Sequence, residues 1–265
     1  MAVRYVAVDF SEAVLLGVLQ GLAEWLPVSS EGLVSLASKL FFSRVFDVAL
    51  ASAIWLHVGT LFSAVVYLRK DVSLVLRGFV KEGPERKLLL FIACTALGSV
   101  VSAVPALVML RGLAVSDSLF TASVGAFLIL TGLIPRRPRR SGVEEDVKTG
   151  LLVGLVQGFS IIPGISRSGV TVSMLLLLGA NVHKAFRLSY LMSIPVVAGG
   201  QILLPLFFGI WSLTPEMLAG ALAAFAVGLL TMKLLLTASA KISHRTLMVP
   251  FGSAIFLLGV LMGLQ

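Results

Sequence analysis

The stretches LLGVLQG (residues 15–21) and LVGLVQG (residues 152–158) open the two segments that decide the fold. Each segment is apolar but too short to cross a bilayer, because a transmembrane helix needs about 20 apolar residues. Each runs into a proline-containing polar cluster, PVSSEG at 27–32 and PGISRSG at 163–169, and then resumes as a second short apolar stretch. We interpret both segments as re-entrant helical hairpins, because irregular backbone at membrane depth is tolerated only inside protein or beside a cavity. Two short interfacial helices joined by a surface loop are the alternative.

Six longer apolar runs accompany these hairpins. The 265-residue chain is 58% hydrophobic and 13% charged, against roughly 25% charged in soluble domains, which excludes a soluble enzyme core. Apolar runs long enough to span occur at 46–68, 88–110, 113–134, 188–210, 217–236 and 247–264. We therefore expect an all-α integral membrane protein with about six transmembrane helices and two re-entrant hairpins.

Basic residues predict the orientation of the spans. Lys and Arg concentrate in the loops at 69–87 and 136–148 and before the last span, whereas the loops at 111–117 and 211–216 carry one basic residue. By the positive-inside rule the basic loops are cytoplasmic. The first hairpin then enters from the outer face and the second from the cytoplasm.

The two hairpins predict an inverted repeat within a single membrane domain, residues 1–265. The first half, 1–140, holds the hairpin at 11–42 and three spans, and the second half, 141–265, holds the hairpin at 150–180 and three spans. An odd number of spans inverts the second copy, so the two polar turns are expected to meet near the bilayer midplane, where such folds place their sites. In this alignment Ser30 lies over Ser166.

Charged residues fall in both polar turns, although a charge inside a membrane is costly. A buried ion pair between Glu31 and Arg167 that only pins the hairpins together is one interpretation. Phosphate handling is the other, because the guanidinium of Arg167 fits phosphate oxygens and Ser166, Ser168 and Gly169 precede a half-helix with free backbone donors. The second interpretation predicts an anion site.

Oxygen ligands are the only plentiful metal ligands in this chain. It has one cysteine, Cys94, and three scattered histidines, which argues against a Cys- or His-based metal site. Glu24 lies one helical turn after Gln20, and this pair suits a hard cation such as Mg²⁺ or Ca²⁺. Ser29 and Ser30 follow closely, and either hydroxyl is available as a nucleophile.

The segments QGLAEWLPVSS (residues 20–30) and PGISRSGVT (residues 163–171) resemble the two signatures of the undecaprenyl-diphosphate phosphatase family of the bacitracin-resistance type. The second segment matches the pattern PGxSRSxxT at every fixed position, and the resemblance covers essentially the whole chain. It implies a membrane phosphatase of cell-wall biogenesis that converts a polyprenyl diphosphate, undecaprenyl- or dolichyl-type, into the monophosphate and inorganic phosphate. It also implies the inverted repeat with two hairpins.

The resemblance implies a role for each matched residue. Ser30 would be the nucleophile, Glu24 and Gln20 the metal-associated or proton-handling pair, and Arg167 the clamp on the phosphate and the transition state. Contacts to the substrate are implied for further residues of the two turns, namely Ser29, Gly164, Ser166, Ser168 and Thr171.

One departure from the family concerns the general base. Family members commonly carry histidine shortly after the serine pair, where this chain has Leu33. The base must then be Glu24 or Glu31, or a metal-bound water replaces it. His57 is the other candidate, as the base or as a substrate contact, and a core histidine bonded to a backbone carbonyl is its alternative interpretation.

The expected partners are the polyprenyl diphosphate and the membrane. We expect a multi-pass plasma-membrane protein whose active site opens to the extracytoplasmic side. Nucleic acid is not expected, because the RRPRR run at 136–140 is typical of a topology anchor. A homodimer is left open. The alternative function is a polyprenyl-phosphate flippase, since inverted repeats with broken helices are also a transporter architecture.

Overall fold

The computed structural model describes residues 4–5, 8–44, 46–110, 117–133, 143–162, 165–208, 210–211, 214–239 and 244–263. Almost all of these residues are helical, as the composition predicts. The helices are α1 (Phe10–Ala23), α2 (Ser30–Phe42), α3 (Phe46–Tyr67), α4 (Arg69–Arg77), α5 (Pro84–Leu110), α6 (Asp117–Leu133), α7 (Val147–Gly158), η1 (Phe159–Ile161), α8 (Arg167–Leu177), α9 (Val182–Phe208), α10 (Pro215–Ser239) and α11 (His244–Gly263). Two strands of two residues each, β1 (Arg4–Tyr5) and β2 (Ile210–Trp211), pair in parallel.

Each of the six predicted spans overlaps a helix of the structure. Among the described residues, α5, α9 and α10 are long and apolar enough to cross a bilayer. The helix α3 passes the same test only together with α4, as a pair bent by 77° that is either a broken span or a re-entrant loop. The helix α6 has 17 residues, and the part of α11 at Val249–Gly263 counts as a shorter apolar helix. A membrane protein with several apolar helices is therefore confirmed, whereas the complete six-span topology stays a prediction.

The chain divides into two compact units. Unit 1 comprises Met1–Arg69 and Ser193–Leu235, and unit 2 comprises Lys70–Met192 and Leu236–Gln265. Each unit contains one of the two predicted hairpins, as the pair α1 and α2 in unit 1 and as α7, η1 and α8 in unit 2. Each compact unit contains residues from both predicted sequence halves. The units therefore do not test the predicted repeat, and its division into 1–140 and 141–265 stays a prediction.

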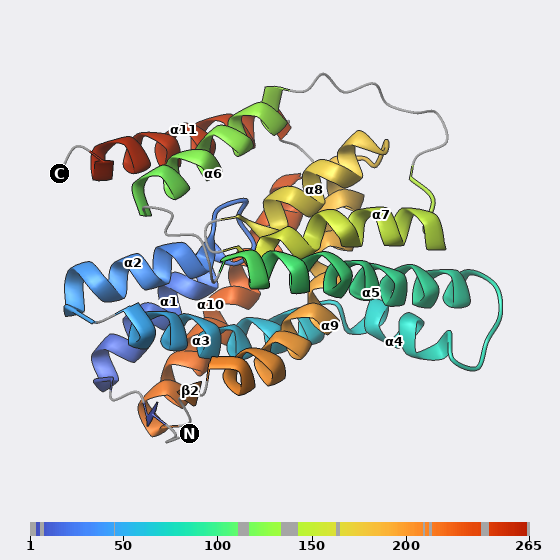
Figure 1. Cartoon of the computed structure of the whole chain (residues 1–265). Coiled ribbons are helices and arrows are strands. Elements are labelled where there is room, and N and C mark those ends of the chain that lie inside the picture. The colour runs from blue at the N-terminus through green and yellow to red at the C-terminus, as the bar shows by residue number, and fades with distance from the viewer. Residues whose placement is uncertain are drawn as a thin grey trace. The chain divides into compact units, whose positions relative to one another are not determined.

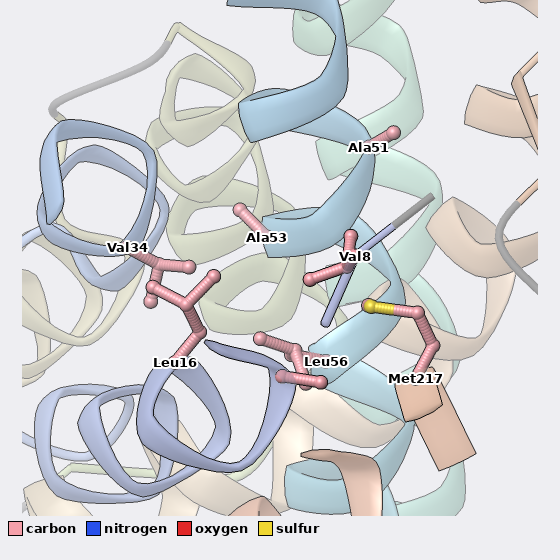
Figure 2. Packing of buried hydrophobic residues seen from close by; sticks show 8 residues of the cluster. Val8, Leu16, Val34, Ala51, Ala53, Leu56 and Met217 are labelled. Atoms are coloured by element: carbon pink, nitrogen blue, oxygen red, sulfur yellow. The ribbon is translucent and has the colours of Figure 1, made fainter. Parts of the chain in front are cut away.

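Unit 1 has its apolar core where α1, α2 and α3 pack against one another. Figure 2 shows the buried side chains that meet there. They are Val8, Ala13, Leu16, Val34, Ala51, Ala53, Leu56 and Met217. This core packs both helices of the first hairpin against α3. The polar turn between α1 and α2 is therefore held in place.

Unit 2 contains two close helix pairs, α5 with α7 and α6 with α11, which Figure 1 draws side by side. In the second pair, a Cβ atom at Gly125 would lie 2.2 Å from the backbone nitrogen of Phe256. Small residues allow backbones to approach this closely, which is how transmembrane helices gain packing in the absence of a strong hydrophobic force.

The repeated glycine of the two hairpins has the same packing role in each unit. A Cβ atom at Gly17 on α1 would lie 2.1 Å from the carbonyl oxygen of Gly220 on α10, in unit 1. A Cβ atom at Gly154 on α7 would lie 2.3 Å from the carbonyl oxygen of Thr95 on α5, in unit 2. In both units the first helix of a hairpin therefore packs against a long apolar helix from the other half of the sequence.

Candidate active site

The turn of the first hairpin lies between two helix ends that the sequence defines locally. The helix α1 ends at Ala23, and the backbone N–H of Glu24 still donates to the carbonyl of Gln20. Ser29 caps α2, because its Oγ accepts a hydrogen bond of 3.3 Å from the backbone N–H of Gly32. Such a cap satisfies one of the free donors at a helix start. The cap leaves the next residue, Ser30, at the first position of α2.

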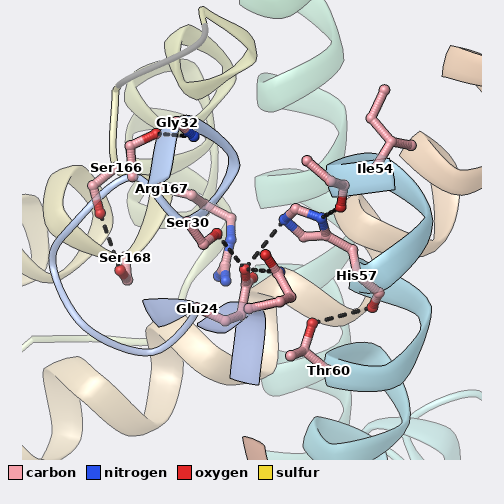
Figure 3. A network of polar contacts seen from close by, with 12 residues as sticks. Glu24, Ser30, Gly32, Ile54, His57, Thr60, Ser166, Arg167 and Ser168 are labelled. Carbon is pink, nitrogen blue, oxygen red and sulfur yellow. Dashed lines mark hydrogen bonds and ion pairs between the residues drawn. The ribbon is translucent and has the colours of Figure 1, made fainter. Parts of the chain in front are cut away.

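The carboxylate of Glu24 is the centre of a buried polar network, which Figure 3 shows. Its Oε2 atom accepts hydrogen bonds from Nε2 of Gln20 at 2.9 Å and from Oγ of Ser30 at 2.7 Å. The Nε2 atom of His57 lies 3.1 Å from the same oxygen. An ionised carboxylate only accepts hydrogen bonds, so three donors converging on one oxygen suit the ionised form of Glu24.

The ring of His57 is fixed by a second contact. Its Nδ1 atom lies 2.7 Å from the carbonyl oxygen of Ala53, one helical turn earlier in α3. A carbonyl oxygen can only accept, so Nδ1 carries a hydrogen, and the contact between Nε2 and Glu24 shares one further proton between the two groups. The carbonyl bond is what the core-histidine interpretation expects, and the Glu24 contact also places His57 in the polar network.

A glutamine of α9 that was not predicted contacts α3 one turn before His57. The Nε2 atom of Gln201, on α9, donates a hydrogen bond of 2.7 Å to the carbonyl of Ile54. This bond ties α9 to α3 three residues before His57 within unit 1. No local motif marks Gln201. An isolated polar residue in an apolar run is the one signal that the sequence offers for it.

The second hairpin turn forms its own cluster of hydroxyl groups in unit 2. Ser166 caps α8, since its Oγ accepts a hydrogen bond of 3.1 Å from the backbone N–H of Gly169. The Oγ atom of Ser168 lies 3.2 Å from that of Ser166. Both serines are buried, as is Thr171 one turn further along α8. The predicted residues Ser166, Ser168 and Thr171 are therefore brought together, whereas Gly164 lies outside the described residues.

A serine of α9 joins this cluster and was not predicted. The Oγ atom of Ser189 lies 2.6 Å from Oγ1 of Thr171, and its carbonyl oxygen accepts a hydrogen bond of 3.4 Å from Nη1 of Arg167. The guanidinium of Arg167 is thus anchored to α9. The proposed ion pair between Arg167 and Glu31 stays a prediction.

The capping residues correct the alignment of the two turns by one position. Ser29 and Ser166 are both N-caps, and they are 166 − 29 = 137 positions apart. The same offset separates Gln20 from Gln157, since 157 − 20 = 137. Ser166 is therefore the counterpart of Ser29, and the predicted nucleophile Ser30 corresponds to Arg167 at the first position of the other half-helix.

The residues predicted to hold a cation offer two oxygen groups. Among the described residues, no group of three or more His, Cys, Asp and Glu side chains is arranged to hold a metal ion. The buried Oε1 atom of Gln20 has no hydrogen-bond partner in the part of the chain that the structure describes, while Nε2 of the same amide donates to the Glu24 carboxylate. Mg²⁺ is often bound through one or two carboxylates plus substrate phosphates. The two groups fit such an ion if a diphosphate supplies the remaining ligands.

Comparison with known proteins adds a family to this geometry. The sequence profile of the bacitracin resistance protein BacA matches residues 13–261, which include most of the first hairpin and all of the second. The chain belongs to the BacA family. It is 40% identical over 245 residues to a protein of Methanococcoides burtonii named undecaprenyl-diphosphatase, covering 88% of this chain and 92% of that protein. A Haloarcula marismortui protein of the same name is 37% identical over 268 residues, covering 95% and 96%.

A third relative of this chain carries the same name. A protein of Korarchaeum cryptofilum, also named undecaprenyl-diphosphatase, is 36% identical over 245 residues and covers 86% of this chain and 90% of its own length. The likeness extends over almost the whole chain in all three proteins. The resemblance found from the two signatures is therefore confirmed at the level of the family.

Proposed function

We propose that this protein is a membrane phosphatase that hydrolyses a polyprenyl diphosphate, of the undecaprenyl or dolichyl type, to the monophosphate and inorganic phosphate. Membership of the BacA family and the name of its relatives support this function. The observation that carries it is the 2.7 Å hydrogen bond from Ser30 to Glu24. A hydroxyl that donates to a buried carboxylate is the arrangement that an activated nucleophile and its base require.

The reaction begins at this contact. Glu24 accepts the Oγ proton of Ser30 while Oγ forms a bond to the terminal phosphorus, and the bond from that phosphorus to the bridging oxygen breaks. The polyprenyl monophosphate leaves with the electron pair of the broken bond. Water then attacks the phosphoserine, and Glu24 returns its proton to the departing Oγ as inorganic phosphate is released. Glu24 is thus proposed as the base that the family histidine, absent at Leu33, does not supply.

Arg167 and the hydroxyl cluster at the start of α8 are proposed to hold the phosphate groups. A guanidinium offers two parallel donors to phosphate oxygens, and the capped start of a helix attracts anions. Ser29, Ser166, Ser168 and Thr171, together with Gly164, are proposed as supporting contacts. Because both residues are proposed to act in the same reaction, the effects of substituting Ser30 and Arg167 on phosphate release should be strongly non-additive.

A divalent cation, Mg²⁺ or Ca²⁺, is part of the proposal. Glu24 and Gln20 are the residues that would hold it, and the cation would neutralise the charge of the diphosphate. Gln20 brings no charge of its own, so the phosphates would contribute most of the negative charge at the site.

The proposed setting is a multi-pass plasma-membrane protein with six spans and two re-entrant hairpins in an inverted repeat. Its site is proposed to open to the extracytoplasmic side, as the distribution of basic loops predicts. The flippase alternative is not favoured, because the relatives are named as diphosphatases and moving a headgroup requires no nucleophile and base.

The decisive experiment measures inorganic phosphate released from a C55 or dolichyl diphosphate by the purified protein in detergent, with and without Mg²⁺ or Ca²⁺. Wild type is compared with Ser30→Ala and with the control Ser35→Ala in the same helix. We expect cation-dependent release by wild type and the control, and none by Ser30→Ala. A folded wild-type protein that releases no phosphate from either lipid with either cation would contradict the proposed function.

A further inference from the structure

The helix α4 and the turn after it expose a row of large apolar side chains. Leu74 is 36% exposed, Leu76 60%, Phe79 67% and Val80 89%. The helix has nine residues, which is far too short to cross a bilayer. Apolar side chains exposed to this degree on a short helix need a partner other than the core of their own unit.

Basic side chains border this apolar row. Lys70, Arg77 and Lys81 are exposed, as are Arg86 and Lys87 at the start of α5. The acidic residue of α4 itself, Asp71, is buried and bound by the guanidinium of Arg187 through two hydrogen bonds, so its charge is neutralised within unit 2. The exposed part of this segment is therefore both apolar and positively charged.

Contacts within unit 2 hold the segment against the first turn of a membrane span. A Cβ atom at Gly78 would lie 2.4 Å from the carbonyl oxygen of Glu85 and 2.8 Å from Cβ of Leu89, both on α5. Nη1 of Arg86 donates a hydrogen bond of 3.3 Å to the carbonyl of Gly78. The apolar helix at Pro84–Val108, a candidate membrane span, begins here, so the end of α4 is held beside the first turn of that helix.

We propose that residues 69–82, the interfacial segment, lie in the cytoplasmic surface of the membrane and bind anionic phospholipid headgroups. Leu76, Phe79 and Val80 would insert between the acyl chains and headgroups, as the apolar side of an interfacial helix does. Arg77 and Lys81 would extend their charged ends to the phosphates while their stems cover apolar surface. An anionic lipid leaflet is the proposed partner, because its acyl chains suit the apolar row and its headgroups suit the positive charge. This inference does not depend on the proposed phosphatase activity.

The depth of the segment can be measured in reconstituted vesicles of phosphatidylcholine and phosphatidylglycerol. In a Cys94→Ala background, Phe79→Cys carries a nitroxide label, and Glu82→Cys, three residues further along the chain, is the control. We expect the label at position 79 to be relaxed more strongly by oxygen than by a water-soluble nickel chelate, and the label at 82 to show the reverse. Equal exposure of both labels to the nickel chelate would overturn the insertion.

The headgroup preference is tested with spin-labelled lipids. The relative association of labelled phosphatidylglycerol over phosphatidylcholine is compared for wild type, Arg77→Gln with Lys81→Gln, and the control Lys148→Gln. We expect the preference to fall by up to about fivefold per removed charge in the double variant, since a surface basic residue contributes about 1 kcal/mol, and to stay near wild type in the control. An unchanged preference would overturn the anionic partner. The nitroxide label at position 79 tests a second copy of the chain as the partner. Spin–spin broadening of its spectrum that grows with the protein-to-lipid ratio would show that the interfacial segment binds a second copy instead of lipid.

Discussion

Ser30 donates its hydroxyl hydrogen to Oε2 of Glu24, six residues earlier in the chain. The contact exists because α1 ends at Ala23 and the chain reverses before Ser29 caps α2. Ser30 thereby stands at the first position of its helix, with its side chain directed to a carboxylate that Gln20 and His57 also contact. The proposed nucleophile and its proposed base are in this way positioned by a single turn.

Substituting Glu24 and Glu31 one at a time should show which of these two carboxylates of the first turn is the general base. Glu24→Gln keeps the size of the side chain but cannot accept the proton of Ser30. We expect kcat for phosphate release to fall by about 10²- to 10⁴-fold, the usual contribution of a general base. Glu31→Gln is the matched control and should retain most of the activity. The opposite ranking of the two variants would assign the base to Glu31.

His57 is expected to position Glu24. His57→Ala removes one of the three donors to Oε2 and frees the carboxylate to rotate away from Ser30. Small misplacements of a catalytic group can cost about 10²-fold in rate, so we expect kcat to fall by about 10- to 100-fold with little change in KM. His57→Gln, whose amide can donate, should recover part of the loss. If both variants keep the wild-type kcat, His57 serves only the packing of α3.

Substitutions of Arg167 test its proposed role in holding the phosphate groups. Arg167→Ala should lower kcat/KM by at least about 10³-fold, because a fixed donor to charge developing in the transition state contributes several kcal/mol. Arg167→Lys should also be severe, since an ammonium does not reproduce the two parallel donors of a guanidinium. The measurement is phosphate release by protein that elutes as the wild type does in size-exclusion chromatography. A variant that fails to fold would favour the ion-pair interpretation.

Glycine packing gives a prediction about stability. A Cβ atom at Gly17 would lie 2.1 Å from a backbone oxygen of α10, so Gly17→Ala must push two helices apart. We expect a loss of about 1–3 kcal/mol, the usual cost of overpacking, seen as a lower midpoint of thermal unfolding in detergent. At Gly199 on α9 a Cβ atom meets nothing within 4 Å. Gly199→Ala should therefore be neutral or stabilising, because alanine is the better helix former.

Asp146, the N-cap of α7, lies outside the membrane spans and should make the stability of the folded state depend on pH. Hydrogen bonds from the side chain and backbone of Thr149 lower the pKa of Asp146 below its usual value of 3.8. The ionised cap therefore stabilises the folded state above the unfolded pKa, and this stability is lost as the pH falls through the lowered value. We expect Asp146→Ala to cost about 1 kcal/mol near neutral pH. The unfolding midpoints of variant and wild type should converge once the pH falls below the lowered pKa of Asp146, and a constant difference at every pH would contradict the cap.

Sequence patterns located the hairpins because their signals are local. A short apolar helix, a proline and a group of serines lie within about 20 residues of one another, and capping by Ser29 and Ser166 follows from which residues can accept a backbone hydrogen bond. Length and apolar composition likewise predicted α5, α9 and α10. The shift of one position between the two turns was missed, because small polar residues align almost equally well in neighbouring registers.

By itself the sequence determined the helical membrane class, the two polar turns and the residues Gln20, Glu24, Ser30 and Arg167 as candidates for chemistry. Only the tertiary structure decided that His57 reaches Glu24, that Ser189 joins Thr171, and that Gly17 and Gly154 each touch a helix of the other sequence half. The physical reason is that helix periodicity and caps depend on neighbours along the chain. Contacts between helices depend instead on which backbones can approach closely, and that is settled when the helices pack.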